Sequence, residues 1–141
     1  MNPKVDQFCG NLRNRLDVVE GRLRAVKMNI QALPEYAETA VREELDGVRR
    51  KLQAQKEHAE QIRANLEARV RKTLTETKEA VSAWKAKRET GKLNARADRA
   101  EAYAADAIDY ALATIDEAEE AVLDAVVARI DAEALTESTS H

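Results

Sequence analysis

The chain has 141 residues, of which 35% are charged and only 4% aromatic, with four glycines and two prolines. This composition is typical of long helices and coiled coils, and it argues against a sheet protein or a thick globular core. The single cysteine excludes an intramolecular disulfide framework, and no apolar segment resembles a secretory signal or a membrane span, so we expect a cytoplasmic protein.

The net charge of −3 is distributed unevenly along the chain. Residues 1–34 carry six basic and three acidic side chains, residues 35–91 carry thirteen and eleven, and residues 92–141 carry four and twelve. The acidic last third therefore has either of two interpretations. It is a face complementary to basic helices in the same bundle or in another subunit, or it is a solvated face that keeps the protein soluble.

The first predicted helix covers about residues 3–32, and Pro3 suits its first turn. Its apolar residues are separated by steps that alternate between three and four, which is a heptad pattern. Such a stripe requires a partner helix, because it is not stable in water. The predicted seam consists of Val5, Cys9, Leu12, Leu16, Val19, Leu23, Val26, Ile30 and Leu33.

Pro34 predicts the first break, because proline disfavours helical backbone at the residue before it and suits the start of a new helix. We expect a short turn and an antiparallel hairpin; the alternative is one kinked helix. A second helix is predicted over about 34–89, with a stutter between Val70 and Leu74. Its seam includes Val41, Leu45, Val48, Leu52, Ile62 and Leu66.

Gly91 predicts the second break, because glycine commonly follows a helix end and the apolar stripe changes phase at this point. A third helix is predicted over about 92–134, either as a hairpin partner of the second helix or as its kinked continuation. Glu119 interrupts the apolar stripe of this helix, and we expect it near the rim of the bundle. Residues 136–141 are polar and are expected to form a disordered tail.

Together these elements predict an all-α protein with three long helices in an antiparallel, coiled-coil-like bundle. Residues 1–135 would form a single elongated helical domain. Because helices of such different lengths overlap only in part, some apolar seam would stay uncovered at the ends. Dimerisation is the simplest way to cover it.

No residue pattern predicts catalysis, a cofactor or a metal ion. Cys9 lies on the apolar seam, where it acts as a small hydrophobic residue, although an antiparallel hairpin would bring it near His58. The carboxylates of Asp116, Glu120 and Asp124 share one helix face, and a solvated acidic face explains them better than a metal site. We therefore predict a protein that is not an enzyme.

One basic patch beside Trp84 is a candidate anion site. Glu89 and Asp98 dilute it and the chain is acidic overall, which disfavours nucleic acid as a partner. Basic side chains near a helix C-terminus explain the patch equally well. Its members are Lys85, Lys87, Arg88, Lys92, Arg96 and Arg99.

The function that the sequence favours is structural: a self-associating helical scaffold or adaptor that acts through coiled-coil seams. The expected partner is a second copy of the chain, as a dimer or higher oligomer, or another helical protein. The alternative is a peripheral lipid-surface or stress-protective protein whose amphipathic helices form only on a surface or on drying. The few large aromatic side chains and the acidic third helix weigh against a membrane surface.

Overall fold

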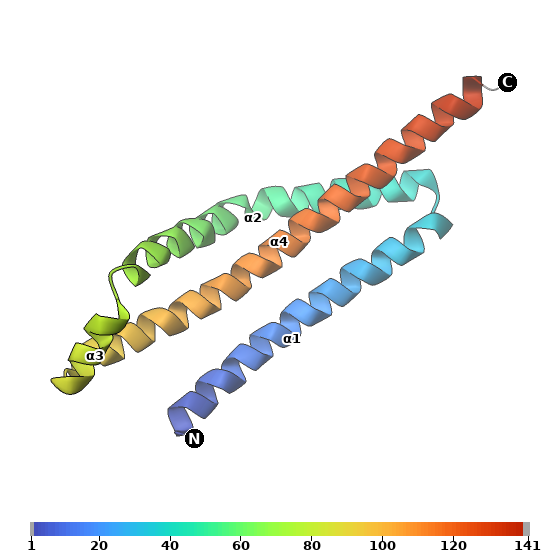
Figure 1. Cartoon of the computed structure of the whole chain (residues 1–141). Helices are drawn as coiled ribbons and strands as arrows, with labels where there is room; N and C mark the ends of the chain where they lie inside the picture. The colour runs from blue at the N-terminus through green and yellow to red at the C-terminus, as the bar shows by residue number, and fades with distance from the viewer. Residues whose placement is uncertain (1, 140–141) are drawn as a thin grey trace. The chain divides into compact units, whose positions relative to one another are not determined.

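The computed structural model describes residues 2–139 and confirms an all-α protein. Four α-helices follow one another: α1 (Pro3–Ala32), α2 (Glu38–Thr73), α3 (Lys78–Ala86) and α4 (Thr90–Thr139) (Figure 1). A 3₁₀ turn, η1 (Leu33–Glu35), joins α1 to α2. Within residues 2–139 there is no strand, and none of the helices has the length and apolar character needed to cross a bilayer.

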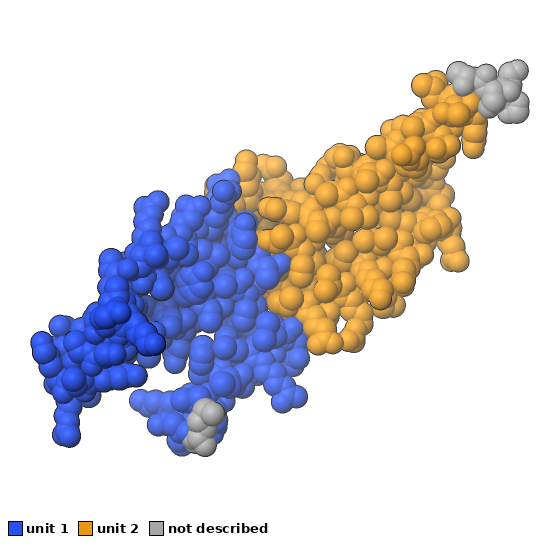
Figure 2. Space-filling model, viewed as in Figure 1, with its two compact units in different colours: residues 1–17, 58–111 blue, residues 18–57, 112–141 orange. Residues whose placement is uncertain are grey.

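The chain divides into two compact units, shown in different colours in Figure 2. Unit 1 comprises residues 1–17 and 58–111, and it contains the start of α1, the end of α2, all of α3 and the start of α4. Unit 2 comprises residues 18–57 and 112–141, and it contains the remaining parts of α1, α2 and α4 together with η1.

Pro34 lies in η1 and not at the start of α2. The N–H of Tyr36 donates to the C=O of Leu33 at 3.0 Å, and Tyr36 then adopts extended backbone. Because of this extended residue, α2 begins at Glu38, four residues later than the sequence predicts.

The predicted helix over 34–89 is also interrupted, because residues 74–77 separate α2 from α3. The Thr77 side chain accepts a hydrogen bond from the N–H of Ala80 at 3.1 Å and so caps the start of α3. Just before it, the Thr75 hydroxyl donates to the C=O of Lys72 at 2.7 Å. Side-chain hydrogen bonds of this kind compete with helical ones and favour a turn.

The second predicted break lies close to Gly91, but Gly91 is not the residue that ends the helix. Arg88 adopts a left-handed conformation with φ of 54°, whereas Gly91 lies in the first turn of α4 without a positive φ. The N–H of Glu89 donates to the C=O of Trp84 at 2.9 Å, and the N–H of Arg88 donates to that of Lys85 at 3.2 Å. These two bonds form a Schellman motif, which ends α3.

The last helix, α4, is longer than the sequence predicts. It runs from Thr90 to Thr139, so residues 136–139 are helical where a disordered tail is expected; residues 140–141 lie outside the described part. Glu119 is also not at the rim, because only 8% of it is exposed. Four helices therefore replace the predicted three.

Unit 2 holds the main apolar core, which lies between η1, α2 and α4. Arg42 on α2 pairs with Asp131 on α4, and Arg49 pairs with Asp124, so the two helices run antiparallel within this unit. Unit 1 is more thinly packed, and Ile62 is the one buried hydrophobic residue in its described part. The core of unit 2 consists of Leu33, Val41, Leu45, Leu123 and Val127, flanked by Val48, Val126 and Ile130.

Candidate interaction surfaces

The heptad pattern of α1 contains two series of residues, and the first series faces the rest of the chain. Its members are seven residues apart. Val26 and Leu33 are buried, and Leu12 and Val19 are half-buried. Val5, the first of this series, is exposed at the start of the helix. Except at that end, this series is covered within the chain.

The second series faces solvent over most of its length. Cys9, Leu16 and Leu23 are all exposed, and Leu16 and Leu23 expose 52% and 56% of their surface. Ile30, the next residue of the series, is half-buried. We call Cys9, Leu16 and Leu23 the outer row; it lies on one face of a single continuous helix.

Two arginines explain why the outer row is turned away from the rest of the chain. Arg15 pairs with Asp109 in unit 1 at 3.2 Å, and Arg22 pairs with Asp116 in unit 2 at 2.5 Å. Each arginine directly precedes a leucine of the outer row. Because successive residues of an α-helix are about 100° apart, a helix that directs these arginines at α4 directs the leucines away from it.

A row of charged residues borders the outer row. Asp6, Arg13, Glu20 and Lys27 are exposed, are seven residues apart and alternate in sign. Three of them, Arg13, Glu20 and Lys27, lie four residues after a member of the outer row, so they are its neighbours on the helix surface. Glu20 of this charged row also pairs with Arg24, one turn further along the same helix, at 2.8 Å.

The predicted seam of α2 is covered by the chain itself. Residues from the start of this seam belong to the core of unit 2 or flank it, and Ile62 is buried in unit 1. These side chains are therefore not exposed for a partner. Val41, Leu45 and Ile62 are buried, and Val48, Leu52 and Leu66 are half-buried.

A basic cleft of about 320 Å³ lies in unit 1, at the end of α2 and the start of α4. Glu76 is the acidic residue in its wall; it pairs with Arg99, and one of its oxygens lies 4.0 Å from Nε of Arg96. Arg69 pairs with Asp106 at 3.0 Å. The lining residues are Asn65, Ala68, Arg69, Lys72, Thr73, Glu76, Arg96, Arg99 and Ala100.

The structure divides the predicted anion patch. Only Arg96 and Arg99 line the basic cleft; Lys85 belongs to α3, and Lys87 and Arg88 follow its end. Lys92 pairs with Glu89 at 3.4 Å, and its ammonium group lies 6.0 Å from the centre of the Trp84 ring.

Sequence reasoning missed two cations of this cleft, Arg69 and Lys72 of α2. Their spacing of three residues matches that of Arg96 and Arg99 and puts each pair on one helix face. That spacing is visible in the sequence. The packing of these two helix faces is not.

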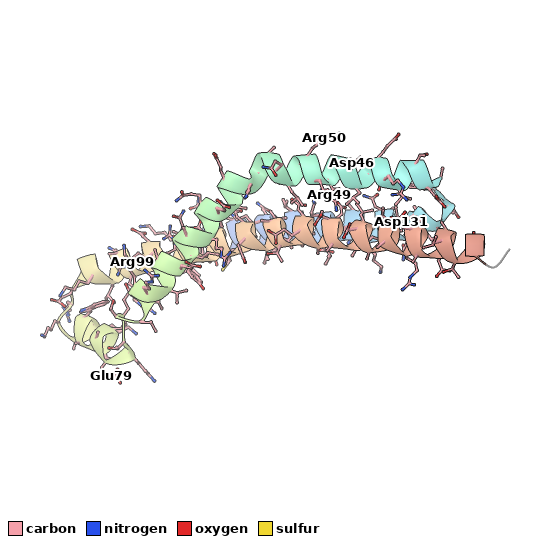
Figure 3. The ribbon with its side chains drawn as sticks, turned by 90° about the horizontal axis from the view of Figure 1, so that it is seen from above. Asp46, Arg49, Arg50, Glu79, Arg99 and Asp131 are labelled. Carbon is pink, nitrogen blue, oxygen red and sulfur yellow. The ribbon has the colours of Figure 1, made fainter. Side chains whose placement is uncertain are left out.

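The acidic face of α4 pairs with basic side chains of α1 and α2. Arg49 contacts both Glu120 at 3.1 Å and Asp124 at 2.9 Å, and Figure 3 shows Arg49 on the side of α2 that faces α4. The hydrogen bond to Glu120 raises the pKa of Arg49 above its ordinary value. Asp116 is approached by Arg22 and by Lys51, at 2.5 and 3.8 Å. The carboxylates considered for a metal therefore have cationic partners.

Neither Cys9 nor His58, the pair considered for catalysis, lines the basic cleft. Cys9 and His58 are both exposed. In residues 2–139, no group of three or more His, Cys, Asp or Glu side chains has the arrangement of a metal site.

Comparison of the chain with protein-family models, curated proteins and solved structures gives no significant match. The features of this chain that bear on function are therefore the outer row, the charged row and the basic cleft.

Proposed function

We propose that this chain is a non-enzymatic, self-associating helical scaffold or adaptor whose contact surface is the outer row of α1. The observation that supports the proposal is that the two series of the α1 heptad pattern face different surroundings. One series packs inside the chain, while Leu16 and Leu23 of the other series face water. An exposed apolar row at heptad spacing is the kind of surface that pairs with another helix in a coiled-coil manner.

The apolar area of the outer row by itself supports only a weak, reversible association. Fully burying a leucine contributes about 1.5–3 kcal/mol, and roughly half of each outer-row leucine is exposed. Two leucines from each of two copies then contribute about 3–6 kcal/mol before the cost of association is subtracted. This gain suits an assembly that forms and dissociates with concentration.

Light scattering across a range of protein concentrations tests this proposal. We expect the wild-type chain to have a mass above its 15.7 kDa monomer, and Leu16→Asp and Leu23→Asp to return it to monomer while helicity stays unchanged. Val18→Asp is the matched control, because Val18 is an exposed α1 residue that lies off the outer row. A wild-type monomer of 15.7 kDa at every concentration would refute self-association.

The same samples test the lipid-surface alternative. A self-associating scaffold is strongly helical in buffer at micromolar concentration. A chain that is poorly helical in buffer and becomes helical only with anionic vesicles would support the lipid-surface function instead. Circular dichroism with and without vesicles separates the two outcomes.

A further inference from the structure

We infer that the partner of the outer row is a second copy of α1 running in the opposite direction, with the two-fold axis at Leu16. This inference rests on the proposed self-association and specifies its geometry. A two-fold contact uses the same surface on both copies, so this surface must be complementary to itself when it is turned end for end.

The charged row meets this requirement. In chain order, Asp6, Arg13, Glu20 and Lys27 have the signs minus, plus, minus, plus. The antiparallel copy presents the reverse order, so Asp6 lies opposite Lys27 and Arg13 lies opposite Glu20. Two copies thus form four pairs of opposite charge along the edge of the contact.

The outer row has the same symmetry. An axis at Leu16 places the two Leu16 side chains against each other and places Cys9 of each copy against Leu23 of the other. The centre of the charged row falls within one residue of this axis. Two independent sets of residues, one apolar and one charged, therefore agree on a single antiparallel register.

A parallel pair fits less well. It places Cys9 against Cys9 and brings Lys27 of one copy beside Arg22 of the other, as in the charged contacts that flank a parallel coiled coil. Arg22 already uses its guanidinium for Asp116 of its own chain. The same geometry brings Arg15 beside Glu20, so a parallel flank holds one like-charged and one oppositely charged kind of pair, whereas all four pairs of the antiparallel flank are oppositely charged.

Thiol crosslinking tests the orientation. Mild oxidation with diamide should link Leu23→Cys chains into covalent dimers through Cys9 of one copy and the new cysteine of the other, and mass spectrometry of the linked peptides identifies the pair. The wild-type chain, whose single thiol lies opposite Leu23, should stay largely unlinked. Val18→Cys is the matched control and should also stay unlinked, because position 18 lies off the outer row.

The outcomes separate this inference from the proposed function. Efficient wild-type crosslinking through Cys9 and Cys9 would overturn the antiparallel register in favour of a parallel one. A Leu23→Cys chain that is dimeric by light scattering but forms no Cys9-linked dimer would also overturn it, while self-association would stand. A monomeric wild-type chain would overturn both. Association with a different helical protein alone would likewise contradict the second copy as partner.

A charge exchange gives a second test that needs no cysteine. Arg13→Glu places like charges opposite Glu20 in both halves of the contact and should raise the dimer dissociation constant roughly three- to tenfold at low salt. The double variant Arg13→Glu/Glu20→Arg should restore the wild-type value. Arg50→Glu on α2 is the control and should change nothing, since Arg50 projects from the side of α2 opposite Arg49 (Figure 3). A double variant as weak as the single one would refute the register.

Discussion

Arg88 ends α3 in a backbone conformation that usually belongs to glycine. Its φ of 54° brings the Cβ atom close to the following carbonyl oxygen, which costs about 1–2 kcal/mol in an L-amino acid. The two hydrogen bonds of the Schellman motif hold it there. Arg88 is therefore left-handed because the motif that ends α3 requires this conformation, and not because its side chain prefers it.

Replacing Arg88 by glycine should therefore stabilise the protein. We expect Arg88→Gly to raise the free energy of unfolding by about 1 kcal/mol, because the Cβ contact disappears and the motif is kept. Urea denaturation measures the change. Lys87→Gly is the control: its φ is −87°, so glycine removes no strain there and should lower stability. A loss of stability in Arg88→Gly would contradict this explanation.

The two arginine–aspartate pairs of α1 and α4 should differ in their contribution to stability. Arg22 contacts Asp116, of which only 8% is exposed, whereas Arg15 and Asp109 are both largely accessible. Arg22→Ala leaves a buried carboxylate with Lys51 as its remaining cation and should cost about 2 kcal/mol.

Arg15→Ala is the matched comparison for that variant. It breaks an exposed pair and should cost less than about 1 kcal/mol. Thermal unfolding of the two variants checks the order. Equal losses would show that the burial of Asp116 does not determine the contribution of the pair.

At the scale of elements, α3 is a separate short helix because of its cap. Thr77 satisfies the N–H of Ala80, one of the amide groups that have no partner inside the helix. We expect Thr77→Ala to cost about 1 kcal/mol and to increase amide exchange in α3 more than in α4. Thr77→Ser should behave like wild type. Uniform exchange changes in both helices would contradict a local role for the cap.

The sequence predicts those elements that have a local signal, such as a heptad pattern or a proline. The alternating apolar steps indicate a helix over 3–32, and α1 spans these residues. Pro34 indicates the turn that follows it. The break before α3 gives no such signal, because the helical spacing continues from Leu74 through Thr77 to Val81 and no glycine or proline intervenes. The stutter between Val70 and Leu74 was the available sign, since both side chains are exposed where the stripe loses its register.

The candidate surface was also predictable only in part, because local spacing does not show which contacts form between distant parts of the chain. Spacing identifies the residues of the heptad pattern in α1, but it does not show which of its two series faces outward. That choice depends on Arg15 and Arg22 reaching carboxylates 94 residues away in the chain. The seven-residue interval between Arg15 and Arg22, repeated by Asp109 and Asp116, is a signal that becomes meaningful only once α1 and α4 pack together.

At the scale of the whole molecule, the uneven distribution of charge along the chain leads to ion pairs within each of the two units. Carboxylates of α4 pair with cations of α1 and α2 in unit 1 and in unit 2. Six of the twelve acidic residues in the last third therefore belong to a complementary face, one of the two interpretations that the sequence allows. The α4 carboxylates in these pairs are Asp106, Asp109, Asp116, Glu120, Asp124 and Asp131.

Self-association predicts that stability depends on protein concentration. Dilution removes the partner from the folded chain, so the midpoint of thermal unfolding should fall by several degrees when concentration is lowered a hundredfold. Leu16→Asp should remove this dependence, because the variant has no partner to lose. Calorimetry at matched scan rates measures both. A midpoint that is independent of concentration in the wild-type chain would contradict the proposed assembly.

The orientation of α1 about its own axis leaves Leu16 and Leu23 exposed. This exposure lowers the stability of a single chain, but it provides the surface proposed for a partner. A helix rolled to cover Leu16 and Leu23 would gain core, but it would leave Asp109 and Asp116 without their arginines and take away the surface for a partner. Leucines in place of Arg15 and Arg22 would permit that roll. On the proposed assembly, selection for a more stable monomer at these two positions would therefore produce a chain that no longer binds a second copy.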